Sequence, residues 1–179
     1  RIVNGFQDWI NGSIGATMFF NARSAVLQTI SFANFINWGD NNVFQAGRAF
    51  ANQKQFWKDF STIFNSAMLK QRRSGLQNDI NAAELSTFIS KSDQPVRAGI
   101  NWLLNKGFLP TQFADSFAIA LGGASMYRNR INTYLKQGLS QKEAQEKAWL
   151  DFTTVAEDTQ QSARPDKLSQ QQRSVLGRL

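Results

Sequence analysis

The chain of 179 residues contains no histidine and no cysteine, and its 20 lysines and arginines exceed its 13 aspartates and glutamates, for a formal net charge of +7. Without those two residue types, the chain cannot supply Ser-His-Asp or Cys-His nucleophilic catalysis, thiol redox chemistry or the usual His/Cys zinc sites. The positive charge favours contact with something anionic, such as packaged DNA, a membrane surface or an acidic protein wall, although it also serves solubility.

Composition predicts an all-α protein. Apolar residues make up 42% of the chain, with 15 Phe and 5 Trp, while only 3 prolines occur. Alternation of β-branched residues with period two is scarce, so we expect five to seven amphipathic helices in an irregular bundle or extended array. Residues 1–161 form the predicted helical module, and 162–179 a polar linker or arm. No secretory leader is visible, and the longest apolar window, 117–126, is too short to span a membrane.

In the first half of the chain, a short helix or arm to Gly12 leads into a predicted helix over 13–38. The stretch 39–42 breaks this helix and provides Asn or Asp side chains to cap the next one. That next helix, predicted over 43–68, carries apolar residues at steps of three and four, which form a core or interface stripe: Val43, Ala46, Phe50, Trp57, Phe60 and Phe64.

In the second half, a basic junction at 70–75 precedes predicted helices over 81–91, 95–106 and 109–137. Pro95 suits a first helical turn, where its missing N–H costs nothing. Gly122 and Gly123 indicate a bend or, with greater weight, close packing against a neighbouring helix. Ser140 and Glu143 form a capping box that starts a last helix, which ends near residue 160.

Several segments carry a resemblance. The clearest are residues 19–38, which combine a helical apolar stripe with particular polar residues, and 97–108 (Arg-Ala-Gly-Ile-Asn-Trp-Leu-Leu-Asn-Lys-Gly-Phe). Further segments follow at 113–120, 127–130, 156–162 and 167–172. Together they resemble, in the same order, a segment of very large internal virion proteins of crAss-like and related tailed bacteriophages.

The resemblance implies a cargo and ejection role. Such a segment would be packaged in the capsid interior or tail lumen, dock on portal, tail or ring proteins, and enter the host cytoplasm with the genome. Packaged DNA is a further partner to consider. The family has no motif with agreed catalytic roles, so we expect no enzymatic activity, cofactor or metal. The expected docking surface is an aromatic stripe made of Phe50, Trp57, Phe60 and Phe64.

An alternative hypothesis is a nucleic-acid-binding accessory segment of a packaged phage polymerase or anti-defence protein. Its support is the basic charge, and its candidate contacts to an anionic partner are Lys70, Arg72, Arg73, Arg128 and Arg130.

Two readings of charged residues carry less weight. Asp151, Glu157 and Asp158 form the densest acidic group, and an enzyme that cleaves peptidoglycan would need a pair of carboxylates for acid/base catalysis. Adjacent residues of a helix such as Glu157 and Asp158, however, point about 100 degrees apart, which disfavours such a pair. Arg23 lies in an apolar helix and could pair with a buried carboxylate such as Asp115.

Overall fold

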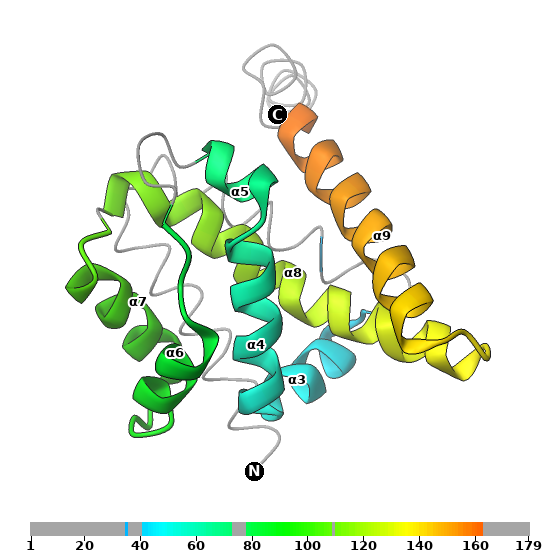
Figure 1. Cartoon of the computed structure of the whole chain (residues 1–179), viewed down its shortest axis with the longest axis horizontal. Helices are drawn as coiled ribbons and strands as arrows, with labels where there is room; N and C mark the ends of the chain where they lie inside the picture. Colours follow the sequence, from blue (N-terminus) through cyan, green and yellow to red (C-terminus); the bar gives the residue numbers. More distant parts are fainter. Residues whose placement is uncertain (1–34, 36–40, 73–77, 109, 163–179) are drawn as a thin grey trace, which may run out of the picture.

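The computed structural model describes residue 35 and residues 41–72, 78–108 and 110–162. These residues contain helices and no β-strand, which confirms the all-α prediction (Figure 1). The helices are α3 (Val43–Ala51), α4 (Gln53–Phe64), α5 (Ala67–Arg72), α6 (Ala82–Ile89), α7 (Pro95–Asn105), α8 (Pro110–Lys136) and α9 (Gln141–Ser162).

Helix α8 organises the arrangement. It is the longest described helix, at 27 residues, and it runs behind α4 across the middle of the view in Figure 1. Helices α3, α4 and α5 pack against it, and α9 turns back from its end and packs along its C-terminal part. Helices α6 and α7 pack on each other, and α6 contacts α4. α8 therefore joins the α3–α5 side of the fold to α9.

An aromatic cluster fills the space between α4 and α8. The rings of Trp57 and Phe60 lie with centroids 5.0 Å apart, and Phe60 meets Phe117 of α8 at 5.2 Å, both edge to face. Phe64 continues the row and contacts Phe108, which follows α7, at 5.9 Å. Edge-to-face contacts add to the free energy of burying the rings, so this cluster stabilises the packing of α4 against α8.

A second apolar contact joins α8 to α9. Phe152 of α9 is fully buried and stacks on Phe35 with centroids 5.5 Å apart. A Cβ atom added to Gly123 would overlap the Cε2 atom of Phe152 and lie 3.0 Å from its Cδ2 atom. The prediction of close packing at the glycine pair is thus confirmed at Gly123, because a side chain there would occupy the space of the Phe152 ring.

The predicted helix over 43–68 is wrong in its continuity, because it is divided into α3, α4 and α5. Asn52 leaves helical geometry with φ −84° and ψ 74°, and its side chain accepts a hydrogen bond from the N–H of Gln55 to cap α4. Asn65 ends α4, and its side-chain amide donates to the Ile80 carbonyl at 2.9 Å and accepts from the Ile80 N–H at 2.8 Å. Two asparagines therefore interrupt a continuous apolar stripe.

The other helix ends in the described part follow their local signals. Asn42 accepts from the N–H of Gln45 at 3.0 Å, Pro95 begins α7, and α8 and α9 match their predicted ranges to within a few residues. The Ser140 N–H donates to the Glu143 carboxylate at 2.9 Å, and the Glu143 N–H donates to the Ser140 hydroxyl at 3.3 Å, which confirms the capping box. The predicted helix over 13–38, apart from residue 35, and residues 163–179 of the predicted arm lie outside the described residues.

We predict that Gly123→Ala destabilises the fold. Alanine favours a helix over glycine by about 1 kcal/mol. Here, however, the new methyl group meets the ring of Phe152, which is fully buried. Overpacking of this kind costs about 1–3 kcal/mol. Urea denaturation should give a lower free energy of unfolding for the variant.

The second variant for this test is Phe152→Leu, which makes room beside Gly123. The double variant should be less destabilised than the sum of the two single changes, because the clash is then relieved. An additive result would contradict the proposed contact.

Candidate functional site

The aromatic stripe predicted to dock on a partner is core, and that prediction is wrong for this fold. Trp57, Phe60 and Phe64 are 0% exposed and Phe50 is 2% exposed. Their rings contact one another and rings of α8 and the α7–α8 connection. The three-and-four spacing correctly identified a buried stripe, but the spacing cannot distinguish burial inside the chain from burial against a partner.

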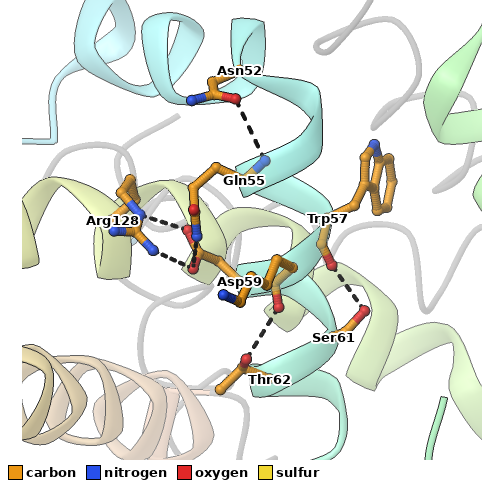
Figure 2. A network of polar contacts seen from close by, with 8 residues as sticks. Asn52, Gln55, Trp57, Asp59, Ser61, Thr62 and Arg128 are labelled. Carbon is orange, nitrogen blue, oxygen red and sulfur yellow. Dashed lines mark hydrogen bonds and ion pairs between the residues drawn. The ribbon is translucent and has the colours of Figure 1, made fainter. Parts of the chain in front are cut away.

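Arg128 and Asp59 form a buried ion pair between α8 and α4 (Figure 2). The Nε atom of Arg128 donates to Oδ2 of Asp59 at 2.7 Å, and its Nη2 atom donates to Oδ1 at 2.6 Å. Gln55 also donates to Oδ1, at 2.9 Å. The Asp59 side chain is 4% exposed and that of Arg128 is 20% exposed. Two parallel hydrogen bonds fix both helices, so the charge of Arg128 is compensated inside the fold.

Arg130 and Asp151 form a second ion pair, which joins α8 to α9. Arg130 Nε donates to Asp151 Oδ2 at 2.7 Å, and its Nη2 atom donates to the Tyr134 hydroxyl at 2.7 Å. The Tyr134 hydroxyl in turn donates to Asp151 Oδ2 at 2.7 Å. Arg128 and Arg130 were predicted to contact an anionic partner, and that contact stays a prediction. In the fold, each of the two arginines pairs with a carboxylate of the chain itself.

A buried asparagine anchors the segment before α3, and the sequence analysis missed it. The Asn41 amide donates to the Phe35 carbonyl at 2.7 Å and to the Ser125 hydroxyl at 3.1 Å. Its carbonyl oxygen accepts from the Asn129 amide at 2.7 Å. Ser125, Arg128 and Asn129 lie at steps of three and four on α8, so a polar stripe within an apolar helix was the available signal.

The remaining basic candidates divide between the described and undescribed parts of the chain. Lys70, at 26% side-chain exposure, forms an ion pair with Asp79. Arg72 is the last residue of α5, and Arg73 lies outside the described residues.

The acidic candidates do not gather into one cluster. Asp151 accepts hydrogen bonds from Arg130 and Tyr134, whereas Glu157 and Asp158 lie exposed further along α9. Asp115 is exposed, so it is not the buried carboxylate that was predicted, and its pairing with Arg23 stays a prediction because Arg23 lies outside the described residues. Within the described ranges no group of acidic side chains is placed to hold a metal ion, and none of the helices has the length and apolarity to cross a membrane.

A half-open polar groove of about 780 Å³ lies where α3, the start of α4 and the C-terminal half of α8 meet. Its cationic lining residues are Arg48 of α3, Arg128 and Lys136 of α8. Five amide side chains also line it: Gln45, Asn52, Gln55, Asn129 and Asn132. Among the described residues that line it there is no carboxylate. The groove therefore brings the exposed cations Arg48 and Lys136 together with amide side chains.

Comparisons of the chain with protein-family models, with curated proteins and with solved structures find no match.

We predict that Asp59→Asn destabilises the fold by about 3 kcal/mol, because it leaves the largely buried guanidinium of Arg128 without a charge partner. Chemical denaturation measures the change. The matched control is Glu84→Gln, which breaks the exposed pair between Glu84 and Lys106, with side chains 54% and 48% exposed. That change should cost less than about 1 kcal/mol. Equal losses from the two variants would argue against a structural role for Asp59.

We also predict an alkaline loss of stability that depends on Tyr134. Burial and the hydrogen bond to Asp151 raise the pKa of the Tyr134 phenol above its ordinary value of 10.0. The unfolded chain then gives up this proton at lower pH than the folded chain, so the stabilisation is complete below pH 10 and disappears as pH rises through the raised pKa. Tyr134→Phe should therefore show a shallower decline of unfolding free energy above pH 10 than the unmodified chain.

Tyr127 provides the control for that experiment, since it is the other of the 2 tyrosines. Burial and the charge of Asp59 raise its pKa as well. The double Phe variant should lose the tyrosine contribution entirely, both in the pH series and in an ultraviolet titration. An unchanged alkaline slope in Tyr134→Phe would refute the assignment.

Proposed function

We propose that this chain is a helical segment of a large phage virion cargo protein, packaged in the particle, docked to portal or tail components and ejected with the genome. The observation that carries the proposal is the ordered resemblance of segments along the sequence to such proteins. No catalytic role is proposed for it.

The resembling segments in the described part coincide with positions that build the fold. Residues 97–108 supply the buried Trp102 and Leu103, and residues 113–120 supply the buried Phe113 and Phe117. Residues 127–130 contain both arginines of the interhelical ion pairs. Agreement at core positions supports a shared helical fold, because core side chains are constrained by packing more than surface ones.

Two features of the chain are compatible with its passage, unfolded, through the channel of a portal or tail. It contains no cysteine, so no disulfide would cross-link the unfolded chain. Some helix contacts join neighbours in sequence, namely α3 with α4, α6 with α7 and α8 with α9, beside the contacts of α8 with α3 and α4. Proteins with local contacts refold quickly. A segment of this kind can regain its fold after delivery.

The docking contact requires exposed apolar side chains, which the buried stripe does not provide. Phe44 of α3 is 85% exposed and Leu150 of α9 is 65% exposed. Aromatic side chains are enriched where proteins contact one another. Phe44 is therefore the docking residue that we propose in place of the buried aromatics.

The proposal is tested on purified particles of the phage that encodes the chain. Mass spectrometry should detect its peptides in virions at a fixed ratio to portal protein, in nuclease- and protease-treated particles. A reconstruction of the particle should show ordered helices against the portal or tail lumen. Absence of the chain from washed virions would refute the cargo role.

Variant phages separate docking from packaging. Phe44→Ala should lower the ratio to portal protein without changing the unfolding free energy of the purified chain, because the ring is exposed. Phe88→Ala, which removes a ring 40% exposed on α6, is the matched control and should leave the ratio unchanged. If the Phe44 variant is incorporated as well as the unmodified chain, Phe44 is not the docking residue. The cargo role itself is then tested by the presence of the chain in washed virions.

A further inference from the structure

The groove between α3, α4 and α8 is positive because of how the carboxylates are distributed around it. Residues 43–64, which form α3 and α4, carry the exposed cations Arg48, Lys54 and Lys58. Their one carboxylate, Asp59, is buried and neutralised by Arg128 (Figure 2). Residues 116–136 of α8 contain no acidic residue. Arg48 and Lys136 make no ion pair with any described residue, so their charges remain available to a ligand.

The uncharged lining adds donors that match an anion. Five asparagine and glutamine side chains line the groove, and an amide NH2 group carries two N–H donors. Gln55 and Asn129 each use one of these donors within the fold, which leaves the second for a ligand oxygen. Asn52 caps α4 at the groove, and the first turn of α4 contains no acidic residue to offset the positive end of the helix. The helix end reinforces a field that Arg48 and Lys136 already create.

The described residues that line the groove include no aromatic side chain on which a base could stack. Contacts from cations and amides to phosphate oxygens position a nucleic acid without reading its sequence. An acidic peptide fits the lining less well, since Leu135 is the one large apolar side chain among the described lining residues and offers little apolar contact. The excess of positive charge over the whole chain points in the same direction.

We propose that this groove binds the phosphodiester backbone of nucleic acid without base specificity, through Arg48 and Lys136 together with the surrounding amides. Arg128 is held by Asp59 and acts as part of the groove wall. This binding is a property of the folded chain itself and does not depend on the location proposed for it in the virion.

Fluorescence anisotropy with a labelled oligonucleotide of about 12 nucleotides, single-stranded and as a duplex, tests the proposal on the 179-residue chain. Binding should weaken steeply between about 50 and 200 mM salt, with little difference between sequences. The double variant Arg48→Gln, Lys136→Gln should weaken binding about tenfold or more and reduce the salt slope by about 2.

The matched control removes the same charge elsewhere. Lys91→Gln with Arg97→Gln neutralises two exposed cations, one in the turn after α6 and one on α7. This variant should retain the affinity and the salt slope to within a small factor. Circular dichroism should show that both double variants keep their helices, since all four side chains are exposed.

Three results would overturn the proposal. The first is no binding by the unmodified chain at low salt. The second is an equal loss of affinity in the two double variants, which would indicate diffuse charge attraction in place of a groove. The third is polyglutamate competing as well as unlabelled DNA, which would assign the groove to acidic protein segments.

Discussion

The structure depends on one buried ion pair, Asp59 with Arg128. A carboxylate with 4% exposure on a helix rich in aromatic residues is tolerated because a guanidinium from α8 meets it with two hydrogen bonds. The pair sets which face of α4 meets which face of α8. Phe60 and Phe117 then come into contact on those same two helices, so the aromatic cluster and the ion pair favour a single register.

Helix α8 carries different polar groups on different faces, and this explains why its two arginines pair with carboxylates on two different helices. Ser125, Arg128 and Asn129 face α4 and the segment before α3, whereas Arg130 and Tyr134 face α9. A helix packed on several sides must satisfy its polar side chains within the fold. Basic residues in its sequence therefore hold neighbouring helices together, and the cations available to an anion stand at its end and on α3.

The two proposed roles rest on different side chains, and α3 contributes to both, because Phe44 and Arg48 are four residues apart on that helix. Docking in a virion is assigned to exposed apolar side chains, with Phe44 foremost, and nucleic-acid contact to the polar groove that contains Arg48 and Lys136. A cargo segment packed beside a genome would meet both kinds of partner. The core aromatic side chains contribute to neither role, because they are buried between α4 and α8.

The sequence by itself determined those features whose cause lies within a few residues. The cap at Asn42, the start of α7 at Pro95 and the capping box of Ser140 and Glu143 follow from neighbouring groups along the chain, and the apolar spacing indicates the buried faces. The all-α class follows from the same local signals.

The tertiary structure decided whatever depends on partners far apart in sequence. Asn65 interrupts the long helix by pairing with Ile80, 15 residues away, and Arg128 finds Asp59 across 69 residues. The burial of the aromatic stripe and the positive sign of the groove have the same origin. Periodicity identifies the face of a helix that is apolar or charged, but what lies against that face is set by packing of the whole chain.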